Sequence, residues 1–214
     1  MNIGVDIDGV LADFNTPFIA LIKKMTGREL PQPSATYPDV WAYHIAGGVT
    51  PEENAKLWDY ISNSDWVTRH QPTPTGEAAL EELNFLAATG YANVYFITNR
   101  GGAHAKRQTE AWLTFYGMKN PTVLIANSDA AKGQLAAGLK LDVFIDDKPE
   151  NCAHVVDATK SVGFFDTDYP CEVFLVDAPY NRDFEMRGVT RVVSALQALE
   201  RVTERDGEQL RRAA

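Results

Sequence analysis

Three short apolar segments, each followed directly by polar residues, constrain the fold of this chain more than any other feature. They are Ile3-Gly4-Val5, Val94-Tyr95-Phe96-Ile97 and Val143-Phe144-Ile145. Apolar runs of this length are typical of strands that are buried on both faces in a parallel sheet. Open α/β sheets carry their chemistry beyond the carboxyl ends of the strands. We therefore expect the residues that follow the three segments to meet along one edge of a single sheet.

The residues at these strand ends are suited to binding a metal ion and a phosphate group. Asp6-Ile7-Asp8-Gly9 follows the first segment, Thr98-Asn99-Arg100 the second and Asp146-Asp147 the third, with Lys132 between the last two. Clustered carboxylates repel one another unless a cation lies among them. The grouping therefore predicts a hard metal ion, and the accompanying ammonium and hydroxyl groups predict a bound phosphate.

Asp6 and Asp8 are the predicted catalytic pair. They lie two residues apart at the end of a strand, so an extended backbone would point both side chains the same way. One carboxylate there can attack phosphorus, and a second can protonate the leaving alkoxide and then deprotonate the attacking water. Gly9 would let the backbone pass close to the phosphate and offer its N–H as a donor. The alternative is that both aspartates are turn or capping residues, or part of a calcium loop.

The second strand end and the lysine supply the predicted phosphate contacts. A hydroxyl at Thr98 and a backbone N–H at Asn99 can hold phosphoryl oxygens, although a helix cap or a turn would also account for them. Arg100 is either a bidentate phosphate ligand or a surface residue. Lys132 is predicted in the first turn of a helix, where a cation is unfavourable. We therefore expect its ammonium to reach an anion, the alternative being a solvated surface lysine.

Asp146-Asp147 is the predicted metal-binding pair, together with Asp6 and Asp8. Two adjacent carboxylates at a strand end suit an octahedral Mg²⁺ ion that keeps several waters. One can ligate the ion directly while the other orients a bound water, and the residues alone do not say which does which. A capping pair at the start of the next helix is the alternative interpretation.

Strands and helices alternate from residue 76 onward, which predicts βαβ units and therefore an α/β fold with a parallel sheet. The predicted elements are a helix at 77–89, a strand at 93–97, a helix ending at Gly117, a strand at 122–126, a helix capped by Ser128, a strand at 142–145, a helix begun by Pro149, strands at 161–165 and 173–176, and a helix at 194–203. We predict a core formed by residues 1–14 and 76–204, and a frayed end over residues 205–214.

Residues 15–75 interrupt this pattern and predict a small helical insertion that forms a cap over the site. Thr16 is the predicted N-cap of a first helix that stops at Gly27. Thr50-Pro51-Glu52-Glu53 reads as a capping box that begins a second helix. The proline-containing stretch at 71–76 predicts a linker back to the core.

The insertion is rich in aromatic side chains, whose faces could stack on a nucleobase. Trp41, Tyr43 and His44 lie in irregular sequence and are candidates for a substrate pocket, as is Arg100 of the core. Trp58 falls on the apolar stripe of the second helix, so we expect it in the insertion's own core. A small helical pair also needs large side chains for packing, and this remains the alternative for all of them.

Composition and net charge indicate which kinds of molecule this protein could bind. The net charge of −9 disfavours binding to a long nucleic acid, but a bound divalent ion would still allow a small phosphorylated substrate. We expect no membrane association, because no apolar run could span a bilayer. The sequence from Asn2 predicts a strand rather than a signal peptide. Cys152 and Cys171 are too few for a disulfide framework, so we expect reduced thiols in a cytoplasmic protein.

Taken in order, the motifs resemble those of the haloacid dehalogenase superfamily of phosphotransferases. These comprise an Asp-x-Asp-Gly, a strand-end Thr, a Lys and a strand-end acidic pair, and in this chain they extend over most of the sequence. The resemblance implies a three-layer, Rossmann-like parallel sheet with a small helical cap after the first strand. It implies that Asp6 is the nucleophile and Asp8 the acid/base, and that Thr98 and Lys132 bind the phosphoryl group.

The same resemblance implies a metal site and a branch of the superfamily. Mg²⁺ would be held by Asp6, the backbone carbonyl of Asp8 and Asp147, with Asp146 in support. An acidic residue at Asp8 is similar to the phosphatase branch, since the dehalogenase and phosphonatase branches lack it.

A narrower resemblance is to the 5′(3′)-deoxyribonucleotidase family. It rests on the sequence around residues 6–14, on 144–151, and on the late segments Asp177-Ala178-Pro179-Tyr180-Asn181 and Arg191-Val192-Val193-Ser194. The chain departs from that family at Thr98-Asn99-Arg100, where Thr-Ser-Pro is usual. The resemblance implies hydrolysis of (deoxy)nucleoside monophosphates through an aspartyl-phosphate. Alternatives are a phosphatase of sugar phosphates or nucleic-acid ends, and a non-catalytic phosphate-binding module.

Overall fold

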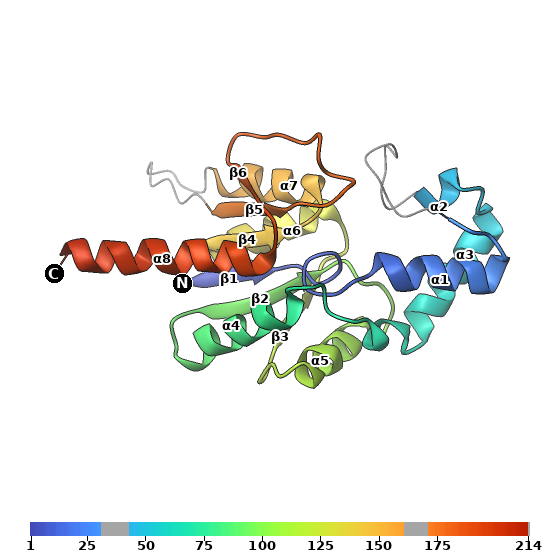
Figure 1. Ribbon diagram of the computed structural model, residues 1–214, viewed down its shortest axis with the longest axis horizontal. Coiled ribbons are helices and arrows are strands. Elements are labelled where there is room, and N and C mark those ends of the chain that lie inside the picture. The colour runs from blue at the N-terminus through green and yellow to red at the C-terminus, as the bar shows by residue number, and fades with distance from the viewer. Residues whose placement is uncertain (31–42, 161–170, 214) are drawn as a thin grey trace.

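A six-stranded parallel sheet organises the computed structural model, which describes residues 1–30, 43–160 and 171–213 (Figure 1). The strands lie in the order β3-β2-β1-β4-β5-β6, so the chain runs outward from β1 to β3 and then crosses back to β4. The predicted α/β fold with a parallel sheet is therefore confirmed. The strand bounds are β1 Asn2–Val5, β2 Asn93–Thr98, β3 Thr122–Ile125, β4 Val143–Asp146, β5 Glu172–Val176 and β6 Val189–Val192.

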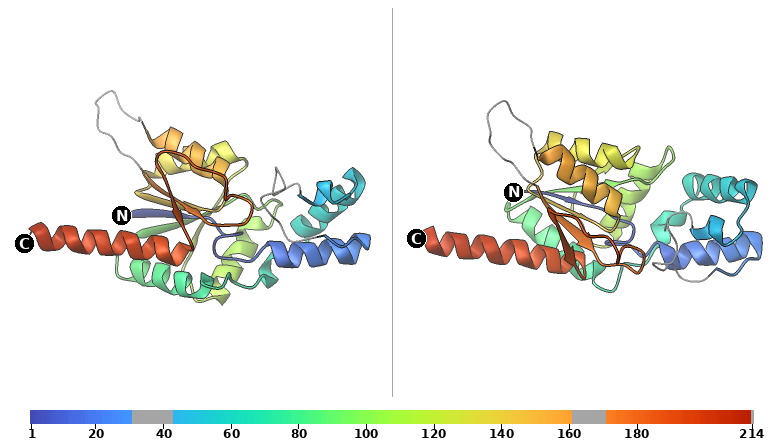
Figure 2. Two further views of the ribbon diagram at one scale, coloured as in Figure 1. Left: turned by 45° about the horizontal axis from the view of Figure 1, so that its top comes forward. Right: turned by 90° about the horizontal axis from the view of Figure 1, so that it is seen from above.

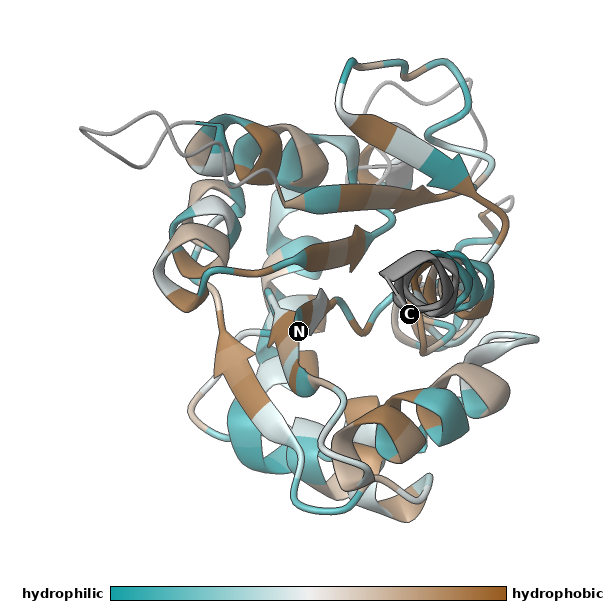
Figure 3. Cartoon of the chain, turned by 90° about the vertical axis from the view of Figure 1, so that its left-hand side faces the viewer, coloured by the Kyte–Doolittle hydropathy of each residue, from teal (hydrophilic) through white to brown (hydrophobic). Residues whose placement is uncertain are grey.

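Helices cover both faces of the sheet and make it the middle of three layers (Figures 1 and 3). Successive strand residues alternate between the faces. Val143 and Ile145 of β4 pack in the apolar cluster that includes α4, α5 and α8, whereas Phe144 packs in the cluster that includes α6 and α7. The helix bounds are α4 Gly76–Ala88, α5 Ala105–Phe115, α6 Asp129–Leu139, α7 Pro149–Thr159 and α8 Ala195–Ala213. Burial on both faces explains why the three segments that opened the sequence analysis are continuously apolar.

The helical insertion lies beyond the carboxyl ends of the strands (Figure 1). It consists of α1 Asn15–Thr26, α2 Tyr43–Ala46, α3 Pro51–Asn63 and the 3₁₀ helix η2 Trp66–Arg69. Side chains from these elements form an apolar cluster of their own, separate from the two clusters of the core. Its buried members are Phe14, Phe18, Leu21, Ile22, Val49, Leu57, Ile61 and Val67. The insertion therefore has its own source of stability.

The two segments that connect the insertion to the core are hydrogen-bonded to each other. The Asp13 amide donates to the Gln71 carbonyl at 2.8 Å, and the Thr73 amide donates to the Leu11 carbonyl at 2.8 Å. Ala12 and Pro72 form an antiparallel bridge between them. The stretch at 71–76, expected to be a simple linker, is thus tied to the loop that follows β1.

Several predicted helix ends are confirmed and one is wrong. The Thr50 hydroxyl and the Glu53 side chain form the predicted capping box of α3, and the Ser128 hydroxyl caps α6. Thr16 is not an N-cap, because α1 already begins at Asn15 and the Thr16 amide instead donates to the Asp13 carboxylate at 3.2 Å. The sequence analysis did not anticipate α2 and η2, which are each only four residues long.

The carboxyl-terminal part differs from the prediction in two ways. Strand β6 was not predicted, because its four residues place the adjacent polar Thr190 and Arg191 between two valines and give a weak signal. Helix α8 continues to Ala213 through residues expected to be frayed, and extends beyond the sheet at the end opposite the insertion (Figure 2). The strand predicted at 161–165 lies outside the described residues. Within the described part of the chain, no helix is both long and apolar enough to cross a bilayer.

The end of α3 packs directly on the loop after β2, and this contact depends on a glycine. Gly102 has a φ of +96°, and a Cβ atom there would lie 2.5 Å from the Ser62 carbonyl oxygen and 3.0 Å from Ser62 Cβ. Nearby, the Gln108 side chain of α5 donates to the Ser64 carbonyl at 2.6 Å. The insertion is thus seated on the core so closely that a side chain at position 102 would collide with Ser62.

Replacing Gly102 with alanine should loosen this contact. We expect Gly102→Ala to lower the free energy of unfolding by roughly 1–2 kcal/mol from backbone strain alone, and to increase proteolysis within residues 70–75. Gly101→Ala is the matched control, because a Cβ there would come no closer than 3.8 Å to Ser62 Oγ. Denaturant unfolding and limited proteolysis of the two variants measure the difference. Equal behaviour of the two variants would contradict the proposed seating.

Candidate active site

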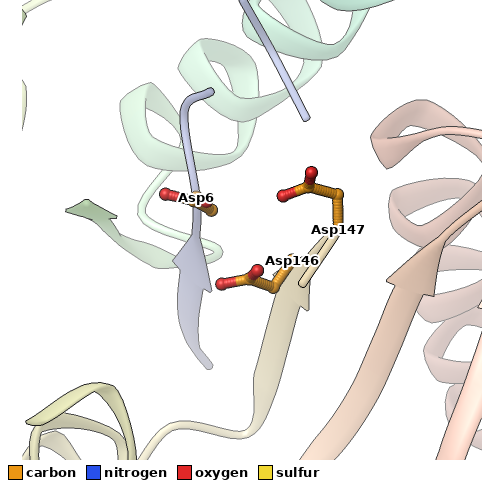
Figure 4. A group of neighbouring side chains, drawn as sticks. All are labelled: Asp6, Asp146 and Asp147. Carbon is orange, nitrogen blue, oxygen red and sulfur yellow. The ribbon is translucent and has the colours of Figure 1, made fainter. Parts of the chain in front are cut away.

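Polar residues at the carboxyl ends of β1, β2 and β4 lie close together, on the side of the sheet that faces the helical insertion. Asp6 follows β1, Thr98 ends β2 and Asp146 ends β4, and β1 lies between β2 and β4 in the sheet. The chain order reverses at the β1–β4 pair, which is where open α/β sheets bind their ligands. The side chains of Asp6, Asp146 and Asp147 gather at this point (Figure 4).

Lys132 links the carboxylates of β1 and β4. Its Nζ atom lies 3.0 Å from Asp6 Oδ1 and 2.8 Å from Asp146 Oδ2, and the side chain is 1% exposed. Asp146 follows Ile145 on β4, so it points to the opposite face, where α6 presents the lysine. Burial opposes the charge of Lys132, but attraction by Asp146 and Asp6 raises its pKa above the ordinary value. The prediction that this lysine reaches an anion is consistent with these contacts.

Asp146 is held from every side by hydrogen bonds. Its Oδ1 accepts from the Lys148 amide at 2.8 Å and from the Asn151 side chain at 3.0 Å, while Oδ2 accepts from Lys132 and Asn151. Both oxygens of this fully buried carboxylate are therefore already satisfied by protein donors. Such a carboxylate is suited to orienting its neighbours rather than to giving up its contacts.

Asp147 differs, because one of its oxygens lacks a partner. Its Oδ2 accepts from the Tyr180 hydroxyl, but among the described residues its buried Oδ1 has no hydrogen-bond donor. A buried polar atom without a partner is costly and points to a missing ligand. Burial, together with the carboxylates of Asp146 and Asp6, raises the pKa of Asp147 well above its ordinary value.

The geometry fits a divalent cation. Asp6, Asp146 and Asp147 each offer an oxygen, and these atoms lie within 4.8 Å of one another. Burial, with the neighbouring carboxylates, raises the pKa of Asp6 to about 7 despite the attraction of Lys132. Carboxylate oxygens are the ligands that Mg²⁺ prefers, and a cation among them would remove the repulsion that raises these pKa values.

Asp8 is paired with Arg100, a contact that the sequence analysis did not foresee. Arg100 Nε donates to Asp8 Oδ2 and Nη2 donates to Asp8 Oδ1, both at 2.7 Å. Arg100 is itself fixed by Thr109 at 3.2 Å, and His70 Nδ1 lies 3.7 Å from Asp8 Oδ1. Burial opposes the charge, but Arg100 and His70 hold the pKa of Asp8 well below its usual range. Arg100, for which a phosphate ligand and a surface residue were the two alternatives, is thus buried and contacts the predicted acid/base.

Gly9 lies against the metal-binding pair. It has a φ of +84°, and a Cβ atom there would fall 2.6 Å from Asp147 Cγ and 3.0 Å from the Tyr180 hydroxyl. The sequence analysis assigned Gly9 a close approach to phosphate. The close approach that the structure contains is to Asp147 and Tyr180.

The remaining predicted phosphate contacts line the same cavity but differ in their surroundings. Thr98 is buried, and its hydroxyl accepts from the Arg100 amide at 3.3 Å. The Asn99 side chain donates to Asp129 at 3.1 Å, and Asp129 also pairs with Lys148 at 2.8 Å. These contacts join the loop after β2 to the start of α6 and to the loop after β4.

The cavity has a volume of about 330 Å³ and lies between the sheet edge and the insertion. Its floor is polar, and its insertion side is formed by Phe14, Trp58, Ile61 and Val67. Trp58 was expected in the core of the insertion, and this is wrong. It is 36% exposed, and its ring stacks on Phe14 with centroids 6.4 Å apart and an interplanar angle of 14°. Helical periodicity placed Trp58 on an apolar stripe, but that stripe is wide enough to reach both the core and the cavity.

Of the three predicted pocket residues of the insertion, the structure places the side chain of His44 alone. His44 is buried beside Phe18, and its Nε2 lies 2.7 Å from the Asn54 side-chain oxygen. It is absent from the described lining of the cavity. Tyr43 begins α2, but its side chain lies outside what the structure describes, and Trp41 lies outside the described residues altogether.

Several lining or supporting residues had no signal of their own in the sequence. The cavity residues Ile61, Ser62, Gln108, Lys148 and Asn151 belong to this group. Lys148 and Asn151 fall in the quoted segment around the acidic pair, so that segment was the available clue. Gln108 is a polar residue on the buried side of α5, a pattern that could have pointed to a functional contact.

Comparison with known proteins decides the family. Residues 1–202 match the family described as 5′ nucleotidase, deoxy (pyrimidine), cytosolic type C protein. The chain belongs to this family. It is therefore a hydrolase of the haloacid dehalogenase type that acts on phosphomonoesters, a nucleotidase, as the sequence motifs predicted.

Curated relatives and solved structures agree with this placement. A Bacillus cereus protein named "Putative nucleotidase" is 29% identical over 160 residues, covering 70% of this chain and 77% of that protein. A similarly named protein of Oceanobacillus iheyensis is 26% identical over 160 residues, covering 70% and 78%. The structure of L-2-haloacid dehalogenase from Xanthobacter autotrophicus superposes with a TM-score of 0.56 at 13% identity, covering 94% of this chain and 98% of that one. At this level of sequence identity, the similarity to the dehalogenase shows only that the two proteins share a fold.

The raised pKa of Asp6 predicts that the metal-free nucleotidase loses stability as the pH rises. The folded protein holds a proton up to about pH 7, whereas the unfolded chain releases it near 3.8. The unfolded state then binds fewer protons, so the free energy of unfolding falls across this interval, by roughly 1.4 kcal/mol at most for each pKa unit. Asp147 acts in the same direction. The lowered pKa of Asp8 has the opposite sign but acts only below 3.8.

Denaturant unfolding in the presence of a chelator, at about pH 5 and about pH 8, measures this effect. Asp6→Asn should reduce the difference between the two pH values, and saturating Mg²⁺ should stabilise the wild type more at the higher pH. If the free energy of unfolding of the metal-free wild type is equal or greater at the higher pH, the raised pKa of Asp6 is contradicted.

Proposed function

We propose that this nucleotidase is a Mg²⁺-dependent phosphomonoesterase that hydrolyses (deoxy)nucleoside monophosphates through a phosphorylated Asp6. The observation that carries the proposal is a single cavity that Asp6, a member of the buried carboxylate cluster, lines on one side and an aromatic wall lines on the other. The carboxylates would hold the Mg²⁺ ion that attracts the phosphate end of such a substrate, and the wall of Phe14 and Trp58 suits its base. A volume of about 330 Å³ is adequate for a small molecule of this class.

Asp6 is the nucleophile in this proposal. Its carboxylate attacks phosphorus, the bond to the leaving alkoxide breaks, and water then cleaves the aspartyl-phosphate to release inorganic phosphate. Lys132 orients Asp6 through the 3.0 Å contact and places a positive charge where the phosphoryl oxygens gather. Asp6 and Asp147 would hold the Mg²⁺ ion, supported by Asp146. When bound, the ion would neutralise the phosphate and the carboxylates around it.

Asp8 is the acid/base in this proposal. It protonates the leaving oxygen and later takes a proton from the attacking water. Arg100 engages both carboxylate oxygens and, with His70, holds the pKa of Asp8 well below its usual range. The acid step therefore requires the Asp8–Arg100 pair to open when the substrate binds, so that Asp8 can take up the proton it delivers. This pairing takes the place of a phosphate contact by Arg100 and is consistent with the departure of the chain at Thr98-Asn99-Arg100.

We propose that residues 15–75 act as a cap that supplies the specificity. Phe14, just before the insertion, and Trp58 of α3 both line the cavity, with their rings nearly parallel. Base–aromatic stacking contributes roughly 1–3 kcal/mol per base. The position of Trp58 in the cavity lining makes it a stronger candidate for this contact than the buried His44.

Asp6→Asn should reduce turnover to background, because an amide is a poor nucleophile and a poorer metal ligand. Phosphate release from deoxynucleoside monophosphates, sugar phosphates and 3′-phosphorylated oligonucleotides is the measurement. Asp13→Asn, which changes a partly exposed aspartate near the cap connection, is the matched control and should retain activity. Wild-type rates in Asp6→Asn would rule out the mechanism. A wild-type enzyme that prefers sugar phosphates would overturn the substrate class alone.

Trp58→Ala should change specificity more than chemistry. We expect the ratio of kcat/KM for a nucleoside monophosphate over that for a simple alkyl phosphate to fall about 5- to 150-fold, the equivalent of a lost stacking contact. Tyr60→Ala, on the same helix and similarly exposed at 39%, should leave the ratio unchanged. If both variants slow the two substrates equally, Trp58 does not contact the base.

A further inference from the structure

The segment between β5 and β6 carries a sequence motif for which the proposed function gives no role. It reads Asp177-Ala178-Pro179-Tyr180-Asn181, and Arg191 follows on β6. The segment begins at the carboxyl end of β5, the strand that pairs with β4. It therefore lies beside the acidic pair, although it is distant from that pair in the sequence.

Two side chains of this segment contact the same residue. The Tyr180 hydroxyl donates to Asp147 Oδ2, and the Asn181 side chain donates to the backbone carbonyl of Asp147 at 2.8 Å. Asp147 is thus fixed at both its backbone and its carboxylate. On the other side the lack of a side chain at Gly9 makes room for this carboxylate, because a Cβ there would lie 2.6 Å from Asp147 Cγ.

Arg191 holds this segment in place. Asn181 is 2% exposed, and its side-chain oxygen accepts from Arg191 Nη1 at 2.7 Å and from the Ala178 amide at 3.1 Å. Arg191 Nη2 donates to the carbonyls of Asn181 and Phe184, both at 2.8 Å. These bonds join β6 to the loop, so the position of Tyr180 is determined by the sheet.

Asp146 and Asp147 are therefore held by hydrogen bonds from different parts of the chain, and these bonds leave different numbers of carboxylate oxygens without a donor in the part of the chain that the structure describes. Asp146 is supported by α6 and α7 and has no oxygen to spare. Asp147 is supported by Tyr180 through one oxygen only, so its Oδ1 stays without a donor among the described residues. A carboxylate that ligates a metal ion is typically oriented by a hydrogen bond to one oxygen, while its other oxygen stays free to bind the ion.

We infer that Tyr180 is a positioning residue for the metal site, whose hydroxyl fixes Asp147 Oδ2 and leaves Oδ1 to bind Mg²⁺. Asn181 and Arg191 hold Tyr180 in the position where it can do so. The inference rests on the proposed function, because it assumes that Asp147 is a Mg²⁺ ligand. It adds that the β5–β6 segment sets the affinity of the site.

Calorimetric titration of the full-length protein with Mg²⁺ alone tests this inference. Tyr180→Phe removes only the hydroxyl, and we expect it to weaken Mg²⁺ binding about 10- to 100-fold, as loss of an outer contact to a metal ligand does. Activity should recover at high Mg²⁺, because the hydroxyl acts through Asp147. Tyr91→Phe, before β2 at the opposite end of the sheet, is the control and should bind Mg²⁺ like the wild type.

Asp147→Asn separates failure of this inference from failure of the proposed site. If Asp147→Asn loses Mg²⁺ binding while Tyr180→Phe binds as tightly as the wild type or more tightly, the positioning role is wrong and the metal site stands. If the wild type does not bind Mg²⁺, or Asp147→Asn binds it normally, the proposed site and this inference both fall. A Tyr180→Phe protein that melts earlier but keeps its Mg²⁺ affinity would show a structural role only, and would also overturn the inference.

Discussion

The mutual repulsion of Asp6, Asp146 and Asp147 is the constraint on which the rest of the site depends. Their oxygens lie within 4.8 Å of one another in a region that is almost closed to water. Lys132 contacts two of them and offsets only part of the negative charge. Arg100 is engaged by Asp8 and cannot help. The remaining excess is of the size that a divalent cation supplies. Burial, together with this excess negative charge, raises the pKa values of Asp6 and Asp147.

In this fold every carboxylate of the site is held by hydrogen bonds or ion pairs with residues from other elements. Lys132 of α6 serves Asp6 and Asp146, Arg100 after β2 serves Asp8, and the β5–β6 segment serves Asp147. Each support arrives on a different element of the three-layer core, so the site is preorganised before any substrate binds. The insertion adds the aromatic wall and is seated on the core through Gly102. In the proposed function, chemistry and specificity thus come from different parts of the chain.

The sequence predicted the sheet and the location of the site because both follow from local patterns. A continuous apolar run predicts a buried strand, and the carboxyl ends of parallel strands meet at one edge of the sheet. Asp6, Thr98 and Asp146 could therefore be grouped from the sequence alone. Pairings between distant residues were not predictable in this way. Arg100 meets Asp8 across 92 residues and Tyr180 meets Asp147 across 33, and both depend on packing between layers. Trp58 was misplaced because periodicity identifies an apolar face but not what covers it.

Anomalous diffraction from crystals grown with Mn²⁺ in place of Mg²⁺ tests the central claim most directly. If the carboxylate cluster is built for one divalent cation, the map should contain a single strong peak between the side chains of Asp6 and Asp147, with Tyr180 still bonded to Asp147. Asp147→Asn crystals grown in the same way should lose that peak. A map with no peak at this position, or with the ion bound elsewhere while Lys132 alone joins the carboxylates, would contradict the account.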